Sequence, residues 1–191
     1  SVLTEPHRFG GSLADLAAAR RLLDGLALGA ARPLVLRKDF IVDAYQIPEA
    51  RAFGADTVLL IVASMRSEAD LGDLIACARR YAMEPLVEVS NEEEMAIALR
   101  QDARVIGINN RNLRTFTVDL STTGRLVRLA NSLWRGDDTR APPTVLALSG
   151  IHSPETVHDV DRPAAGSCPG AILRVGVLVG EHLMRAADPA A

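Results

Sequence analysis

The feature that most constrains this chain is the regular alternation of short apolar runs with longer helical patterns. The apolar runs are almost unbroken, which is typical of strands buried on both faces of a parallel sheet. Their connections are too long for hairpins, so we expect parallel strands joined by helices, the α/β class. The expected strands lie at residues 1–6, 34–40, 57–62, 85–89, 105–108, 144–148 and 175–179.

Two architectures fit this alternation, an open doubly wound sheet and a closed (β/α)8 barrel. No G-x-G-x-x-G follows the first strand, which weakens the dinucleotide-binding version of the open sheet. A chain of 191 residues suits one domain. The residues themselves leave both architectures open.

Local signals predict where several helices begin. Ser12 can cap a helix, Ser67 begins an approximate capping box, and Ser90 to Glu93 has the pattern of a full capping box. Ser153 followed by proline is a further start signal. The segment 7–11 is expected to be a loop.

Composition excludes several classes of function. Hydrophobic residues make up 48% and charged residues 24%, as in ordinary globular proteins. A net charge of −3 with 4% aromatic residues argues against a nucleic-acid surface. Cys77 and Cys168 lack metal-ligand spacing, the histidines do too, and no apolar run is long enough to span a bilayer. We therefore expect a cytoplasmic protein without a metal, a membrane or a nucleic-acid partner.

The strand at residues 34–40 ends in charged residues. With period-two alternation, Lys38 continues the apolar face of Leu34 and Leu36. Burying an ammonium there is costly unless an anion or a substrate compensates it, which makes Lys38 a candidate functional group. A lysine that reaches from the strand end to water is the alternative.

Polar residues recur at the carboxyl ends of the expected strands, which meet at one mouth in a parallel barrel. They are Lys38, Glu88, Asn109 with Arg111, Ser149 with Gly150, and Gly180 with Glu181. The Glu88 carboxylate should need a partner, and Lys38 is a candidate for it. Such a pair could transfer protons in both directions, or it could be an ion pair that only closes the barrel top.

Two loops near the carboxyl terminus are candidates for binding phosphate. Ser149 and Gly150 follow one strand, and Gly180 precedes a short helix that begins at Glu181. Such loops offer backbone N–H groups and a positive helix end, and loops after the last two strands hold phosphate in many barrels.

Long motifs in this chain resemble those of one enzyme family. They are Ser-Val-Leu-Thr-Glu-Pro (1–6), Leu-Arg-Lys-Asp-Phe-Ile-Val-Asp (36–43), Gly-Ala-Asp-Thr-Val-Leu-Leu-Ile-Val (54–62), Leu-Val-Glu-Val (86–89), Ile-Gly-Ile-Asn-Asn-Arg-Asn-Leu-Arg-Thr-Phe (106–116), Leu-Ser-Gly-Ile (148–151) and Leu-Val-Gly-Glu-His-Leu-Met-Arg-Ala-Ala-Asp (178–188). With them the chain resembles indole-3-glycerol-phosphate synthase, a (β/α)8-barrel enzyme of tryptophan biosynthesis.

The resemblance implies a reaction without cofactor or metal. The reaction closes the ring of 1-(2-carboxyphenylamino)-1-deoxyribulose 5-phosphate to form indole-3-glycerol phosphate, with loss of CO2 and water. By resemblance, Lys38 is the general acid at the ribulose carbonyl, Glu88 is an acid–base residue for dehydration, and Asn109 assists catalysis by orienting the substrate. The implied substrate-binding residues are Arg111 and the apolar walls Phe9, Phe40, Leu59, Leu113 and Phe116; Ser149, Gly150, Gly180 and Glu181 form the implied phosphate site.

The chain departs from the family pattern in three ways. The family's first strand, with a second catalytic lysine and a glutamate, lies upstream of the motif at Ser1. We therefore expect residues 1–191 to be a barrel domain that starts near the second strand and is inactive and poorly stable alone. Leu148 stands where many members carry glutamate, and Ala-Leu-Ser-Gly-Ile (147–151) looks like the variant of fungal multifunctional enzymes. Residues 161–171 look like an insertion in the final unit.

The resemblance to fungal multifunctional proteins also implies partner domains. By resemblance, glutamine amidotransferase and phosphoribosylanthranilate isomerase domains are covalently linked to this one. Two other interpretations compete with the synthase. One is a non-catalytic barrel remnant that serves assembly, and the other is a different phosphate-binding barrel enzyme such as the isomerase, which would not explain Lys38 and Glu88 in these motifs.

Overall fold

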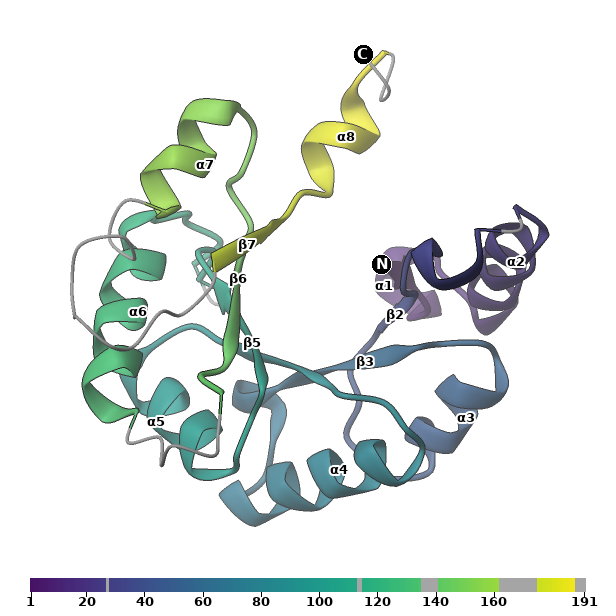
Figure 1. Ribbon diagram of the computed structural model, residues 1–191, viewed down its shortest axis with the longest axis horizontal. Coiled ribbons are helices and arrows are strands. Elements are labelled where there is room, and N and C mark those ends of the chain that lie inside the picture. Colours follow the sequence, from purple (N-terminus) through teal and green to yellow (C-terminus); the bar gives the residue numbers. More distant parts are fainter. Residues whose placement is uncertain (27, 113–114, 135–140, 162–174, 188–191) are drawn as a thin grey trace. The chain divides into compact units, whose positions relative to one another are not determined.

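The computed structural model describes residues 1–26, 28–112, 115–134, 141–161 and 175–187 (Figure 1). The chain forms two compact units, residues 1–87 and 88–191. Among the described helices, none has both the length and the apolar character needed to cross a bilayer.

The first unit is built on three parallel strands. Its elements are β1 (Val2–Leu3), α1 (Pro6–Phe9), α2 (Leu13–Gly25), the 3-10 helix η1 (Gly29–Ala31), β2 (Leu36–Lys38), α3 (Gln46–Ala52), β3 (Thr57–Ile61), the 3-10 helix η2 (Val62–Ser64) and α4 (Glu68–Arg80). Strand β2 lies between β1 and β3 and is parallel to both. Helices α3 and α4 pack against β3 and against each other (Figure 1).

The second unit repeats the same arrangement. Strand β4 (Leu86–Val89) crosses the boundary between the units, and it is followed by α5 (Glu92–Arg100), β5 (Val105–Asn109), α6 (Ser121–Leu133), β6 (Thr144–Leu148), α7 (Pro154–Asp161), β7 (Val175–Leu178) and α8 (Glu181–Arg185). Strand β6 lies between β5 and β7 and is parallel to both. Helix α6 packs on β5 and contacts α5 and α7 (Figure 1).

Strand order decides between the two architectures that the sequence allows. In a doubly wound sheet the order reverses at a switch point. Neighbouring strands follow chain order within each unit, and a helix follows each described strand from β1 to β7. The fold is therefore α/β with the order of a (β/α)8 barrel, as the alternation and the resemblance predicted.

Burial agrees with the predicted core. The four residues from Val58 to Ile61 in β3 are all buried, as expected for a strand covered on both faces. Leu71, Leu74 and Ile75 are buried on one side of α4. In the second unit, Ala147 of β6 packs with residues of and around α7.

Two predicted helix caps are confirmed, and a third lies one residue later than predicted. Ser12 Oγ accepts a hydrogen bond from Asp15 N at 3.1 Å, and Ser67 Oγ accepts one from Asp70 N at the same distance. At α5 the cap is Asn91, whose side chain accepts from Glu94 N at 3.0 Å. The predicted box at Ser90 to Glu93 is therefore wrong.

The later start of α5 has a physical reason. The sequence contains two overlapping cap patterns, and with the cap at Asn91 the Glu94 carboxylate accepts from Ser90 N at 2.7 Å and from the Asn91 amide at 2.7 Å. The same start places Met95 and Ala98 on the buried side of the helix. Packing selects between two equally good local signals.

The segment 7–11 is not simply a loop, because α1 occupies its beginning. The Glu5 carboxylate accepts hydrogen bonds from three successive backbone N–H groups, those of His7, Arg8 and Phe9, at 2.7 to 3.2 Å. Gly10 then ends the turn with a φ of +64°. A glutamate at the cap is an unusual choice, which is why the cap was missed.

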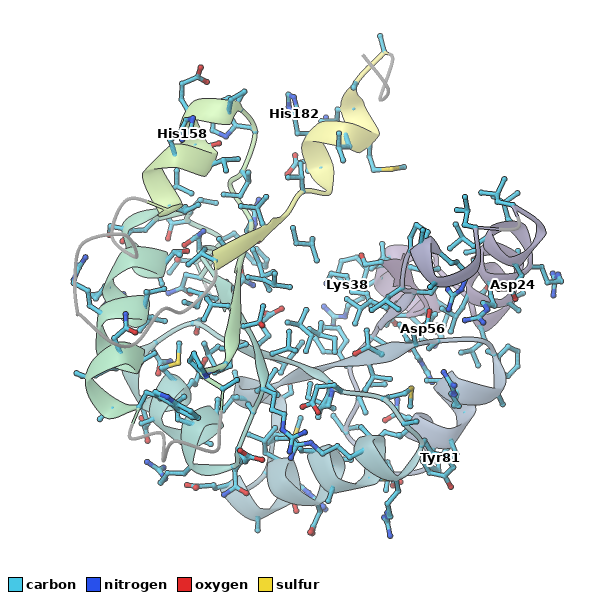
Figure 2. The ribbon with its side chains drawn as sticks, in the orientation of Figure 1. Asp24, Lys38, Asp56, Tyr81, His158 and His182 are labelled. Carbon is cyan, nitrogen blue, oxygen red and sulfur yellow. The ribbon has the colours of Figure 1, made fainter. Side chains whose placement is uncertain are left out.

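Asp56, an acidic residue just before β3, connects α2 with the residues that precede β2. Asp56, which is labelled in Figure 2, accepts two hydrogen bonds from Arg32 at 2.8 and 2.9 Å, one from Arg20 at 2.9 Å and one from Val35 N at 2.8 Å. Burial raises the pKa of Asp56, but these hydrogen bonds outweigh it and lower the pKa to about 2. The ionised carboxylate is therefore part of the folded structure.

We expect Asp56→Asn to destabilise the protein by about 2 kcal/mol at pH 7, because the folded-state pKa of about 2 lies below the ordinary carboxyl value of 3.8. A depressed carboxyl pKa contributes stability that is present above pH 4 and is lost as the pH falls towards 2. Urea unfolding at pH 7 and pH 3 measures both effects. Asp24→Asn is the matched control, since Asp24 pairs with Arg20 at 2.8 Å but is 48% exposed and should contribute under about 1 kcal/mol. Equal stability of both variants would contradict the role given to Asp56.

Candidate active site

Lys38 is the last residue of β2, and its backbone is held by the neighbouring strand. Its carbonyl oxygen accepts a hydrogen bond from Thr4 N at 3.1 Å, and Leu3 is its partner in β1. The side chain, which is labelled in Figure 2, is half-buried. Lys38 Nζ has no hydrogen bond or ion pair within the described residues of the first unit.

The predicted apolar face around Lys38 is wrong. Strand β2 begins only at Leu36; Leu34 is 74% exposed and Phe40 is 43% exposed. Because β2 has only three residues, the chain leaves the sheet before Leu36 and after Lys38. Period-two alternation therefore does not extend over residues 34–40. Lys38 is placed by the strand end and not by an apolar surface.

A stronger signal for Lys38 is in the composition. The chain has 21 lysine and arginine residues in total, and Lys38 is its single lysine. Arginine stays protonated at any pH at which proteins function, so it cannot donate and recover a proton as a lysine can. The one position with an exchangeable ammonium lies at the carboxyl end of a parallel strand, where barrel enzymes carry their chemistry.

The buried charge on β2 is Arg37, which the sequence reasoning missed. Its side chain is 4% exposed. The guanidinium donates to Glu49 at 2.8 Å, to Asp39 at 3.0 Å, to Thr4 Oγ1 at 3.1 Å and to the Gln46 carbonyl at 2.9 Å. These partners lie in or beside β1, β2 and α3, so Arg37 connects the elements around Lys38.

The predicted apolar residues of the first unit separate into two environments. The rings of Phe9 and Phe40 lie 6.5 Å apart between centroids, with 30° between their planes, and both are exposed. Leu59 is 2% exposed within β3. The structure therefore brings Phe9 into contact with Phe40, which follows Lys38 by two residues in the chain.

Glu88 and Asn109 form a buried pair in the second unit. Asn109 Nδ2 donates to Glu88 Oε1 at 2.9 Å, and both side chains are under 10% exposed. Asn109 Oδ1 accepts from Arg111 N at 2.9 Å, which fixes the orientation of the amide. Three of the predicted residues are thus connected at the ends of β4 and β5. Their predicted partner Lys38 belongs to the other unit, and that pairing stays a prediction.

The Arg111 guanidinium lies among other predicted residues. It donates to the Phe116 carbonyl at 3.4 Å and lies 3.5 Å from the Glu181 carboxylate. Glu181 also pairs with Arg185 at 3.1 Å. Phe116 is 68% exposed and has a φ of +59°. Leu113 lies outside the described residues.

Asn110 is a structural residue of this region that the sequence reasoning did not single out. It is 2% exposed, its amide donates to the Ser149 carbonyl at 3.2 Å, and its Oδ1 accepts from the Thr123 hydroxyl at 2.8 Å. Its backbone N donates to the Leu148 carbonyl at 2.9 Å. Asn110 therefore holds the end of β6 and the start of α6 in place.

The predicted phosphate residues Ser149 and Gly150 form a tight turn after β6. Their φ values are +66° and +79°, and a Cβ on Gly150 would meet a Val118 methyl at 2.6 Å. His152 Nδ1 lies 2.8 Å from the Gly150 carbonyl. Leu148 is buried, so the turn is preceded by an apolar residue.

Gly180, the other predicted phosphate residue, is the N-cap of α8. It follows β7, which is the direct neighbour of β6. The two predicted phosphate loops therefore follow adjacent strands. Gly180 has no side chain and is followed by the Glu181 carboxylate, so phosphate binding there would depend on backbone groups.

A cavity of about 570 Å³ in the second unit does not belong to this site. It is lined by residues around the amino-terminal ends of β5 and β6, among them Arg104, Trp134 and Pro142. The predicted residues Asn109 and Ser149 lie at the opposite ends of these strands, and no described site residue lines the cavity.

Parallel strands in chain order, with acidic, amide and cationic side chains at or near their carboxyl ends, define an α/β protein of the (β/α)8-barrel class. The family model of indole-3-glycerol phosphate synthase matches residues 1–191. The chain belongs to this family.

Relatives of known name agree with the family. The chain is 49% identical to the multifunctional tryptophan biosynthesis proteins of Phanerodontia chrysosporium and Schizosaccharomyces pombe, over 98% and 100% of its length. It is 47% identical over 99% of its length to the indole-3-glycerol phosphate synthase of Kineococcus radiotolerans. The chain spans only 21%, 22% and 59% of these relatives.

Solved structures agree with the fold. The 3-hexulose-6-phosphate synthase from Salmonella typhimurium superposes with a TM-score of 0.64, covering 98% of this chain and 80% of that one. Sequence identity is 15%, so the likeness concerns the fold alone.

Proposed function

We propose that this chain is the synthase domain of a tryptophan-biosynthesis enzyme, and that residues 1–191 contribute to one barrel. The enzyme converts 1-(2-carboxyphenylamino)-1-deoxyribulose 5-phosphate to indole-3-glycerol phosphate, CO2 and water. The observation that carries the proposal is the buried Glu88 carboxylate held by the Asn109 amide, in a chain that belongs to the synthase family.

In this proposal Lys38 is the general acid of ring closure. Its ammonium donates a proton to the ribulose carbonyl oxygen as the aromatic carbon attacks the carbonyl carbon, and CO2 then leaves that aromatic carbon. Among the described residues of its own unit no ion pair engages the ammonium, which leaves it available to a substrate oxygen. Lys38 is the single lysine of residues 1–191, and unlike the arginines it can release and recover a proton.

Glu88 then takes part in the loss of water. A carboxylate in a buried position is suited to proton transfer because few water molecules compete for it. The Asn109 amide fixes one carboxylate oxygen at 2.9 Å, so the proton is exchanged at a defined place. Arg111, whose backbone is bonded to Asn109, would orient an anionic group of the substrate.

The remaining predicted residues bind the two ends of the substrate. Phe9 and Phe40 already form an aromatic contact, which suits them to cover the anthranilate ring. Ser149, Gly150 and Gly180 would bind the phosphate through backbone groups of two loops that follow neighbouring strands. Leu59, Leu113 and Phe116 complete the proposed apolar walls.

The multifunctional relatives suggest covalent partners. Because the chain spans about a fifth of their length, we include fused glutamine amidotransferase and phosphoribosylanthranilate isomerase domains in the proposal. A cytoplasmic location, expected from cysteine usage, is part of it too.

Incubating the complete protein with the carboxyphenylamino sugar phosphate tests this function. We expect indole fluorescence to appear together with one CO2 for each indole formed. A phosphoribosylanthranilate isomerase would instead consume phosphoribosylanthranilate and release no CO2. Absence of both indole and CO2 from a folded protein would exclude the synthase.

A further inference from the structure

We infer that Asp39 is a positioning residue for Lys38 and Phe40, and that Arg37 and Thr4 hold it in place. This inference rests on the proposed function, because it concerns how that reaction's acid and aromatic wall are oriented. Asp39 lies between the two residues in the chain, and its side chain is 11% exposed. Neither the motif nor the charge pattern assigned it a role.

Both Asp39 carboxylate oxygens are used, and each acts on a different neighbour. Oδ2 accepts from the Thr4 hydroxyl at 2.6 Å and from Arg37 Nη2 at 3.0 Å. Oδ1 accepts from Phe40 N at 2.8 Å. The first oxygen therefore holds Asp39 against β1 and β2, while the second fixes the backbone where the chain leaves the strand.

Lys38 is consequently held on both sides. Its carbonyl accepts from Thr4 N at 3.1 Å, the residue before it is the buried Arg37, and the residue after it is Asp39. Thr4 acts twice, since its backbone holds Lys38 and its hydroxyl holds Asp39. A backbone fixed in this way sets the point and the direction from which the Lys38 side chain leaves β2.

Arg37 also connects this cluster to α3. Its guanidinium also donates to Glu49 at 2.8 Å and to the Gln46 carbonyl at 2.9 Å, so α3 is connected to the same group. Glu49 accepts from Arg37, but among the described residues it has no hydrogen bond to residues 38–40, whereas Asp39 accepts from Phe40 N. The cluster therefore offers one carboxylate that touches the chain around Lys38 and one that does not.

The test compares Asp39→Asn with Glu49→Gln in the complete protein. We expect Asp39→Asn to lower kcat about 10- to 100-fold, since small displacements of a reacting group have effects of this size, while KM changes less than about threefold. Glu49→Gln also removes a negatively charged partner of Arg37 and should lower the melting temperature. Its kcat should stay within about twofold of the parent. The inference would be overturned if the fall in kcat were proportional to the fall in melting temperature in both variants. It would also be overturned if kcat fell in neither variant.

A second pair of variants covers the case in which Asp39→Asn does not fold. Thr4→Val removes the hydroxyl but keeps the shape of the side chain, and Thr4→Ser keeps the hydroxyl. We expect kcat to fall in Thr4→Val and to stay close to that of the parent in Thr4→Ser. Equal kcat in the two variants would count against positioning through Asp39.

A readout independent of turnover separates this inference from the proposed function. Acetic anhydride acetylates the neutral form of the Lys38 amine, and mass spectrometry of the peptide that contains Lys38 measures the rate. This rate reports the accessibility and the surroundings of the Lys38 amine. We expect this rate to change at least about threefold in Asp39→Asn and to stay unchanged in Glu49→Gln. An inactive parent with this difference would refute the synthase and keep the positioning, while equal rates in all three proteins would refute the positioning.

Discussion

Lys38→Ala in the complete protein is expected to lower kcat about 10²- to 10⁴-fold, because a positioned general acid typically contributes that much. The fold should be unaffected. Within the part of its own unit that the structure describes, the ammonium has no ion pair that the change could break. The backbone contacts of Lys38 do not involve its side chain. Steady-state kinetics by indole fluorescence and a thermal melt measure the two halves of this prediction.

Lys38→Arg separates charge from proton transfer. The guanidinium keeps the positive charge near the same place but does not release its proton, so we expect activity nearly as low as that of the alanine variant. If the arginine variant were close to the parent, Lys38 would act only through its charge. Parent-like turnover in the alanine variant would remove Lys38 from the mechanism altogether.

Glu88→Gln is the second change with a large expected effect. The amide oxygen of glutamine can still accept from Asn109 Nδ2, so the buried hydrogen bond at 2.9 Å is retained and the fold should persist. Proton transfer is lost, and we expect kcat to fall about 10²- to 10⁴-fold. The pH profile of kcat should lose the limb that the carboxylate contributes.

Glu92→Gln is the matched control for this change in the same unit. Glu92 is an exposed carboxylate at the start of α5 that pairs with Arg125, so its loss should leave kcat unaltered. An activity and a pH profile of Glu88→Gln equal to those of the parent would make Glu88 structural only. A fall in kcat of equal size in both variants would indicate a general effect of charge.

Agreement between sequence and structure is best where local patterns decide the outcome. The unbroken apolar run around Leu60 predicted a strand covered on both faces, and the stripe around Leu74 predicted the buried side of α4. Ser12 and Ser67 predicted helix starts to the residue. Each of these signals is complete within a few neighbouring residues.

Errors arose where a local pattern allowed more than one outcome. The overlapping cap patterns at Ser90 and Asn91 were equal in sequence, and the burial of Met95 and Ala98 selected the second. The apolar residue Leu34 suggested a longer strand, but β2 has only three residues because the chain leaves the sheet on both sides of it. Tertiary contacts decided both cases.

By itself, the sequence determined the α/β class, the family and the positions of the polar residues at strand ends, since periodicity and motifs are properties of the chain alone. Only the tertiary structure decided that the buried charge of β2 is Arg37, which contacts Thr4 from 33 residues earlier in the chain. It likewise decided that Asn110 holds Ser149, 39 residues later. A buried polar group must find partners, and those partners come from whichever segments the fold brings alongside it, which no local pattern specifies.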